Sequence, residues 1–323
     1  MSAEIETMMY VKDTPWHGLG VYVGDENIDS KTAIIKAGLN WEVEKQRLYT
    51  SPDGINSQEV DTNKAIVRVS DQKVLGIVGN RYHPIQNLES FEFMDSLVES
   101  GQMKYHTAGS LRGGQQVWLL GKISDTEIVP GDKIDHYLFL HNTHDGSSSL
   151  RVLFTTTRVV CANTAQIALQ KGQNQGLRVM HTKNIKHKIE QAKHILEIGQ
   201  IEVNNFNTWA KKAVNTQLSA NKWLDIVNNI IPMPPLDKRT KQIETARQNI
   251  RNEITHLYYE GAGQDIQGVA GTAWAGYNAV VEYANFYKKA RGTNQQEKRF
   301  IGSLFGGTSK LIEKTVLELS KAA

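Results

Sequence analysis

Cysteine is almost absent from this chain, because Cys161 is the only one among 323 residues. A single thiol excludes an intramolecular disulfide and is typical of proteins in a reducing cytoplasm. It also argues against a structural zinc site, which usually needs several thiolates or closely spaced histidines. No apolar run approaches the roughly 20 residues that span a bilayer, and the N-terminal MSAEIETMMYVKD lacks the basic start and apolar core of a secretory signal. We therefore expect a cytoplasmic protein with no membrane partner.

Signatures of nucleotide chemistry are also missing. The chain contains neither a Walker loop nor a GxGxxG dinucleotide fingerprint. The sequence WHGLG at residues 16–20 lacks the Gly-Lys-Ser/Thr ending of a Walker loop, and we interpret it as a tight N-terminal turn. Asp132 with Asp135, or the polar residues 141–145, lie in turn-like loops where such residues bond their own backbone. We expect no cofactor, no metal and no enzymatic activity.

Acidic residues are scarce between Arg151 and Lys193, where Glu190 stands alone. The eight basic residues of this stretch are Arg151, Arg158, Lys171, Arg178, Lys183, Lys186, Lys188 and Lys193. The first sixty residues have the opposite bias, with five Lys/Arg and ten Asp/Glu, so the net charge of +3 conceals an acidic front and a basic middle. Two interpretations stay open: a surface that neutralises nucleic-acid phosphates, or a solvated face paired with the acidic N-terminal part.

A second candidate surface combines aromatic and basic residues near the C-terminus. The aromatic residues are Trp274, Tyr277, Tyr283, Phe286 and Tyr287, and Lys288, Lys289 and Arg291 follow them. Proteins that bind single strands combine stacking rings with a basic track, but aromatic residues at helical spacing belong more often to a core. We expect Trp274 and Tyr277 in the core and Tyr287 in contact with a base.

Cys161 is a third candidate, as a nucleophile. It follows a predicted strand and precedes a predicted helix, and a helix N-terminus lowers the pKa of a thiol. However, the sequence places no histidine beside it, and free cysteine is among the most buried residue types. We expect a structural role and rank thiol-based hydrolysis last.

Short strands separated by turns characterise the first half of the chain. Alternating residues predict a hairpin that turns at Asp71 and Gln72, followed by a helix over 87–100 with Asn87 as its N-cap. Further strands are expected over 116–123, 135–141 and 150–160, then a helix over 163–170. On the strand over 150–160, Arg151 and Arg158 are an odd number of residues apart and should point to opposite faces.

This order of elements predicts an α+β fold, an antiparallel sheet with helices on one face. After Gly176, apolar stripes at helical spacing predict a mostly helical region. We therefore expect an α+β sheet domain at residues 1–175 and a helical C-terminal region at 176–323.

Seven segments occur in a characteristic order. They are TPWHGLG (14–20), RYHPIQN (81–87), AGSLRGGQQVWLLGKI (108–123), HNTHDGSSSLRV (141–152), RVVCANTAQIAL (158–169), GTAWAGYNAVVEYANF (271–286) and SLFGG (303–307). Together they resemble the phage/plasmid-like protein family, a domain-of-unknown-function family of phages, plasmids and bacteria. The resemblance implies a mobile-element protein in a bacterial cytoplasm with a role in DNA metabolism. More distantly, the expected fold and basic segment are similar to phage single-strand annealing recombinases. Those proteins form rings or filaments and bind single-stranded DNA without nucleotide hydrolysis.

The sequence therefore predicts an oligomeric protein that binds single-stranded DNA and promotes strand annealing in phage or plasmid recombination. The expected phosphate contacts are Arg151, Arg158, Arg178, Lys183, Lys186 and Lys188, and Tyr287 is the expected stacking residue. The alternative is a protein-interaction module, such as a host-takeover or anti-defence factor, whose basic face meets an acidic partner.

Overall fold

The computed structural model describes residues 5–11, 20–24, 28–148, 150–158, 163–166, 177–178, 185–289, 299 and 307–322. Its chain forms two compact units, each drawn from three stretches. Unit 1 comprises Met1–Ile123, Leu138–Leu153 and Gly176–Ile198, and unit 2 comprises Ser124–Tyr137, Phe154–Gln175 and Gly199–Ala323. The division into domains 1–175 and 176–323 stays a prediction.

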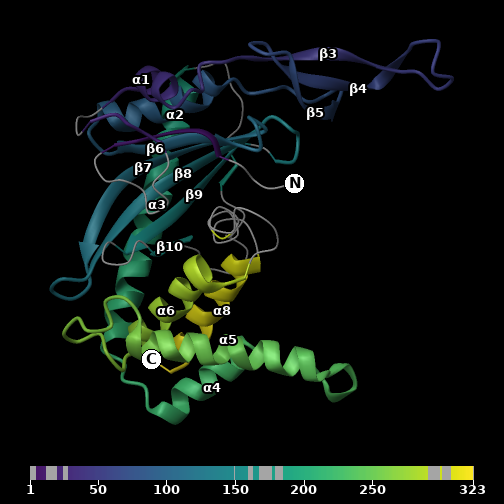
Figure 1. Cartoon of the computed structure of the whole chain (residues 1–323). Coiled ribbons are helices and arrows are strands. Elements are labelled where there is room, and N and C mark those ends of the chain that lie inside the picture. Colours follow the sequence, from purple (N-terminus) through teal and green to yellow (C-terminus); the bar gives the residue numbers. More distant parts are fainter. Residues whose placement is uncertain are drawn as a thin grey trace. The chain divides into compact units, whose positions relative to one another are not determined.

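Among the described residues the strands are β1 (Ile5–Tyr10), β2 (Val21–Tyr22), β3 (Val43–Thr50), β4 (Gln58–Arg68), β5 (Lys73–Gly79), β6 (Lys104–Leu111), β7 (Gln116–Glu127), β8 (Lys133–Thr143), β9 (Arg151–Arg158), β10 (Asn163–Gln166) and β11 (Leu177–Arg178). The helices are α1 (Ser30–Lys36), α2 (Asn87–Glu99), α3 (Ile185–Val214), α4 (Ala220–Ile230), the 3-10 turn η2 (Leu236–Lys238), α5 (Lys241–Glu260), α6 (Ala273–Glu282), the π-helical turn η3 (Tyr283–Tyr287) and α8 (Gly307–Ser320). The predicted α+β class is confirmed, with strands concentrated in the first half and helices in the second (Figure 1).

The larger sheet has the strand order β10-β9-β8-β7-β6-β1-β2, and β11 pairs with β9 off that path. β1 and β2 run parallel, whereas β6 pairs antiparallel with both β1 and β7. Gly109 of β6 is required by close packing, because a Cβ at this position would lie 2.3 Å from the ring of Trp118 and 2.5 Å from the carbonyl oxygen of Thr7. A missing side chain thus lets an indole lie across the strand.

The predicted hairpin about Asp71 and Gln72 is confirmed. β4 and β5 pair antiparallel around this turn, β3 pairs with the other side of β4, and Gln72 adopts a positive φ of 58°. The face of this three-stranded sheet that is buried carries Val43, Ile66, Leu75 and Val78, with Trp41 and Tyr82 packed against them. The alternation of apolar and polar residues therefore marks a genuine half-buried sheet.

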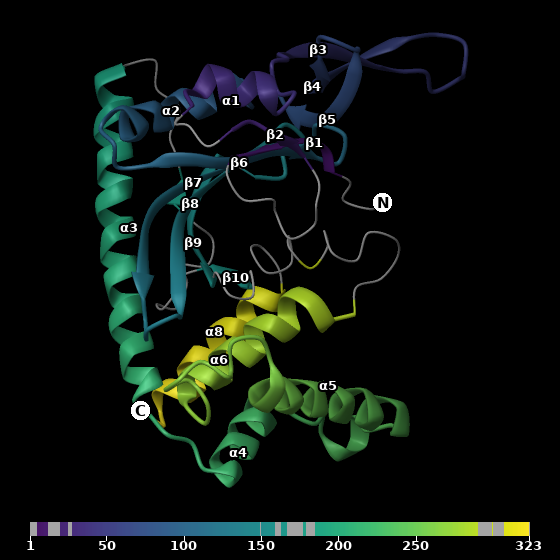
Figure 2. The ribbon, with the colours of Figure 1, turned by 60° about the vertical axis from the view of Figure 1, so that its left-hand side comes forward.

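Two helices cover one face of unit 1 beside β1 and β6 (Figures 1 and 2). α1 begins with Asp29 as its N-cap, whose carboxylate accepts a hydrogen bond from the backbone nitrogen of Thr32. Asp95 of α2 joins the layers, because it accepts hydrogen bonds from Ser30 of α1 at 2.6 Å and from the hydroxyl of Tyr105 of β6 at 2.8 Å. The helices are therefore fastened to the sheet by a polar side chain as well as by apolar packing.

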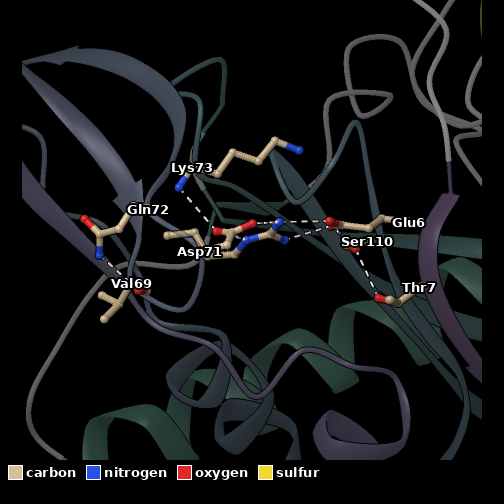
Figure 3. A network of polar contacts seen from close by, with 8 residues as sticks. Glu6, Thr7, Val69, Asp71, Gln72, Lys73 and Ser110 are labelled. Atoms are coloured by element: carbon tan, nitrogen blue, oxygen red, sulfur yellow. Dashed lines mark hydrogen bonds and ion pairs between the residues drawn. The ribbon is translucent and has the colours of Figure 1, made fainter.

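A buried arginine links the two sheets of unit 1. Arg68 of β4 donates to both carboxylate oxygens of Glu6 on β1, at 2.9 and 3.0 Å, and to both oxygens of Asp71, at 2.6 and 2.9 Å. Its guanidinium also lies 5.2 Å from the ring centroid of Trp41. Figure 3 shows Asp71 and Glu6 on opposite sides of this network, and Ser110 donates to Glu6 at 3.1 Å. The cation is fully matched inside the unit.

The Arg68 network shifts the acidity of its members. Hydrogen bonds from Arg68 are the main cause that lowers the pKa of Asp71 to about 2. Burial raises the pKa of Glu6, but the hydrogen bond and charge of Arg68 outweigh burial and leave it below the ordinary value. The bonds to Asp71 and Glu6 in turn raise the pKa of Arg68. All three groups are therefore charged at neutral pH.

Helices form most of unit 2. α6 packs against α5 and α8, and α4 packs against α5 and α8 (Figure 2). Every residue of α6 is buried, and its Trp274 stacks on Tyr277 with 5.3 Å between the ring centroids. Phe206 and Trp209 of α3 complete this aromatic cluster. The expectation that Trp274 and Tyr277 belong to the core is confirmed.

Two local predictions are wrong. Residues 163–166, expected to begin a helix, form β10, which pairs antiparallel with β9 in the register Thr164 to Thr157. Hydrogen bonding to an open strand edge here outweighs the helical spacing of the apolar residues. The N-cap of α2 is Gln86 rather than Asn87, because Gln86 and Glu89 form a capping box. Asn87 instead donates to the carbonyl of Leu39 at 2.9 Å.

Candidate nucleic-acid interface

Two of the predicted contact residues are direct neighbours across a strand pair. In the antiparallel pair of β9 and β11, Arg151 is the register partner of Arg178, and Val152 is the partner of Leu177. Register partners in an antiparallel pair lie directly opposite one another on neighbouring strands. The fold therefore brings two arginines that are 27 positions apart in the chain to one place on unit 1.

A buried histidine lies near this pair. His141 of β8 is 6% exposed, and its Nε2 lies 3.3 Å from Oε1 of Gln116. Burial is the main cause that lowers the pKa of His141 to about 4; the charge of Asp145 opposes this shift, and the charges of Arg151 and Arg112 add to it. His141 is therefore neutral at physiological pH, and Arg151, Arg112 and Asp145 are described charged groups that act on it.

Arg112 is a member of this surface that sequence analysis missed. It lies in the turn between β6 and β7, has an exposed side chain and adopts a positive φ of 53°. The two glycines that follow it, Gly113 and Gly114, also have positive φ. Such a turn is the signal that could have indicated its exposure, because a left-handed turn at a hairpin end projects its side chains into solvent.

The remaining predicted cations are less closely grouped. Arg158 ends β9 within unit 2 and is the register partner of Asn163. Lys186 and Lys188 lie in the first turns of α3, which begins at Ile185. Lys183 and the side chains of Arg158, Arg178, Lys186 and Lys188 lie outside the described residues. The register thus joins Arg151 with Arg178 and gives Arg158 a different partner.

Tyr287 lies at the end of the π-helical turn that continues α6. Its side chain is 47% exposed, whereas Tyr283 at the start of the turn is 7% exposed. Lys288 follows, and its ammonium donates to the hydroxyl of Thr308 at the start of α8. Burial lowers the pKa of Lys288. The structure therefore leaves the ring of Tyr287 accessible on unit 2 and directs the next cation toward a helix N-terminus.

Three further arginines gather on unit 2 without having been singled out from the sequence. Arg239 precedes α5, and Arg247 and Arg251 lie on that helix. The charges of Arg247 and Arg239 act on Arg251 and, after burial, lower its pKa. Their signal in the sequence is the four-residue spacing of Arg247 and Arg251, which places both on one helix face.

The other sequence candidates contribute nothing to a described site. Cys161 and the turn at residues 14–19 lie outside the described residues. Across the ranges that the structure describes, histidines, acids and cysteines do not gather in groups of three or more that could hold a metal ion. None of the helices in those ranges has the length and apolar character needed to cross a bilayer.

The chain matches one family model, described as Domain of unknown function (DUF932), over residues 74–304. The match spans more than two thirds of the chain and includes β5 to η3. Neither a curated protein nor a solved structure matches the chain.

Proposed function

The chain belongs to the DUF932 family of unknown function, and we propose that it binds single-stranded DNA and promotes strand annealing without nucleotide hydrolysis. The observation that carries the proposal is the register pair of Arg151 and Arg178 on unit 1. Like charges directly opposite one another in a sheet repel. A phosphate between them offsets that repulsion and accepts charge-assisted hydrogen bonds from both guanidinium groups.

Further cations extend this binding surface. Arg112 acts on the same buried histidine as Arg151, and Lys186 and Lys188 lie in the first turn of α3, which contains no acidic residue. Lys183 belongs to the same basic segment of the sequence, and Arg158 of that segment is a separate proposed contact on unit 2. Contacts from several cations suit recognition of the sugar-phosphate backbone, which is independent of sequence.

Annealing is proposed from the resemblance to phage single-strand annealing recombinases and from the lack of a nucleotide-binding motif. Such proteins act as homo-oligomeric rings or filaments, and we propose the same for this chain. β3 is an edge strand of its sheet, so its outer backbone groups can pair with a neighbouring copy. A bacterial host cytoplasm and a phage or plasmid origin are parts of the same proposal.

The proposal is tested with fluorescence anisotropy of labelled oligo(dT) at increasing salt. The double variant Arg151→Gln, Arg178→Gln removes both charges while keeping polar side chains on the strands. We expect weaker binding, and we expect the slope of log K against log salt to become shallower by about 1.4, since each phosphate contact on a single strand contributes about 0.7. Lys31→Gln on α1 is the control, because it removes an exposed charge of the same unit away from this surface.

Two results would contradict the proposal. The parent protein could fail to retain oligo(dT) even at about 50 mM salt, where electrostatic binding is strong. Alternatively, the double variant could bind with the affinity and salt slope of the parent. Mixing complementary strands with and without the protein tests annealing directly, and size-exclusion chromatography with light scattering measures the oligomer.

An alternative function is favoured by one exposed apolar surface. Val74 and Ile77 of β5 are 56% and 57% exposed, and Val69 in the preceding turn is 42% exposed. Exposed apolar residues are a feature of many protein-binding surfaces, so the second candidate is a host-takeover or anti-defence factor. Salt-sensitive capture of a host protein without retention of oligonucleotide would select this function over DNA binding.

A further inference from the structure

Two arginines of unit 2 clamp the loop between α4 and α5. Arg251 donates through Nε and Nη2 to the carbonyl of Ile231, at 3.0 and 2.8 Å. Arg239 donates in the same way to the carbonyl of Pro234, at 3.3 and 3.2 Å. A guanidinium has five N–H donors in a rigid fork, so each of these side chains retains donors on Nη1. The loop therefore holds two oriented cations.

A third arginine lies beside this pair and has no partner among the residues that the structure describes. Arg247, one helical turn before Arg251 on α5, is half-buried and forms neither a hydrogen bond nor an ion pair with another described residue. Its charge acts on Arg251 together with that of Arg239. Partial burial of a cation costs solvation free energy, and a carboxylate usually offsets that cost. Here none of the described carboxylates pairs with Arg247.

The cations continue from α5 onto the π-helical turn. α5 packs against η3, and the charges of Arg247 and Arg299 both act on Tyr283. Arg299 donates through Nε to the carbonyl of Lys288 at 2.7 Å. Two acids lie on this surface: Glu244, 3.7 Å from Nε of Arg239, and Glu253, whose charge acts on Tyr283. The cations of this surface are Arg239, Arg247, Arg251, Lys288 and Arg299. Among the described residues that these contacts and charges link, positive groups thus outnumber negative ones.

We infer that this α5–η3 surface is a second nucleic-acid contact, at which Arg247 and the Nη1 donors of Arg251 hold backbone phosphates and Tyr287 stacks on a base. The inference rests on the proposed function and adds a site on unit 2. A nucleic-acid strand fits better than a small anion, because the cations follow a helix and the adjoining turn instead of surrounding one point. An exposed ring at the end of a basic row is the combination used by single-strand binders.

Arg247 is the residue to change, because it supports no described hydrogen bond, whereas Arg251 and Arg239 hold the loop. Arg247→Gln should leave the melting temperature unchanged and weaken oligo(dT) binding about 3- to 10-fold near physiological salt. The magnitude of the salt slope should fall by about 0.7, the share of one phosphate contact. Arg247→Lys should keep the slope but not the full affinity, since an ammonium lacks the bidentate fork. Lys222→Gln on α4, an exposed cation of the same unit, is the matched control.

The outcomes separate the two proposals. If Arg247→Gln binds like the parent while Arg151→Gln, Arg178→Gln binds more weakly, the second contact is wrong and the proposed function stands. If the parent retains no oligo(dT), both are wrong. Weakening by Arg247→Gln with a reduced salt slope, beside an unaffected Lys222→Gln, supports the second contact.

Discussion

Arg68 in unit 1 and Arg247 in unit 2 show two opposite ways of placing a cation. Arg68 is 7% exposed and donates four hydrogen bonds to two carboxylates. Arg247 is half-buried near two further arginines and has no carboxylate partner among the described residues. In the first arrangement, carboxylates of the protein itself neutralise the cation. In the second arrangement, no described carboxylate neutralises the cation, which can therefore pair with an anionic ligand.

This difference distinguishes a charge that stabilises the fold from a charge that remains available to an anion. A matched cation lowers the free energy of the folded state and offers little to a partner, because its donors are already used. An unmatched cation contributes little or unfavourably to folding and keeps its donors for an anion. The charge balance around each arginine, rather than the number of arginines, therefore indicates where we propose that a polyanion binds.

The largest expected effect comes from removing the matched cation. Arg68→Met leaves Glu6 and Asp71 without their partner, and we expect it to lower the free energy of unfolding by about 2–3 kcal/mol, less than for fully buried carboxylates because both can hydrate. Arg247→Met should change it by less than about 0.5 kcal/mol. Urea unfolding at pH 7 measures both. Equal losses in the two variants would remove the distinction between the two kinds of site.

Reversing charge in the basic segment should affect binding and spare folding. The variant Lys183→Glu, Lys186→Glu, Lys188→Glu should bind all oligonucleotide sequences more weakly, with a salt slope shallower by about 2. Acids near the N-terminus of α3 favour its dipole, so the helix should remain intact. The control reverses three exposed lysines elsewhere: Lys31→Glu, Lys104→Glu and Lys222→Glu. Unchanged oligonucleotide binding by the first variant would show that these lysines are not part of the interface.

Substitutions at Tyr287 test whether its exposed ring contacts a base. Tyr287→Ala should weaken oligo(dT) binding by about 1 kcal/mol, the low end for loss of one stacked base. Tyr287→Phe keeps the ring and should bind like the parent. Anisotropy titrations of the three proteins decide the matter, and equal affinity of Tyr287→Ala would show that the ring is not in contact.

The smallest effect is expected in the acid dependence of stability. Because the pKa of Asp71 is lowered to about 2 and that of Glu6 is lowered too, their contribution is complete above the ordinary carboxyl range and is lost as the pH falls toward 2. Arg68→Met should therefore lose less stability than the parent below pH 4.5. Between pH 6.5 and 4, the parent and Arg68→Met should lose the same amount of stability, because burial lowers the pKa of His141 and His144 to about 4 in both proteins. Urea midpoints measured at pH 7, 5 and 3 provide the comparison.

The sequence predicted those parts of the fold that depend on nearby residues. The β4–β5 hairpin follows from alternation around a turn, and the burial of Trp274 and Tyr277 follows from helical spacing. Local patterns failed where a distant partner decided the outcome. Residues 163–166 became a strand because β9 offered an open edge, and the pairing of Arg151 with Arg178 depends on a register that no local pattern encodes.

The sequence by itself determined the α+β class, the core aromatic residues and the basic bias of the segment from Arg151 to Lys193, because composition and periodicity are properties of neighbouring residues. Only the tertiary structure decided which cations are matched. Arg68 meets Glu6 across 62 positions, and Arg247 lies near Arg239 and Arg299 through the packing of α5. Charge pairing depends on distance in space, and distance in space follows from the packing of the whole chain.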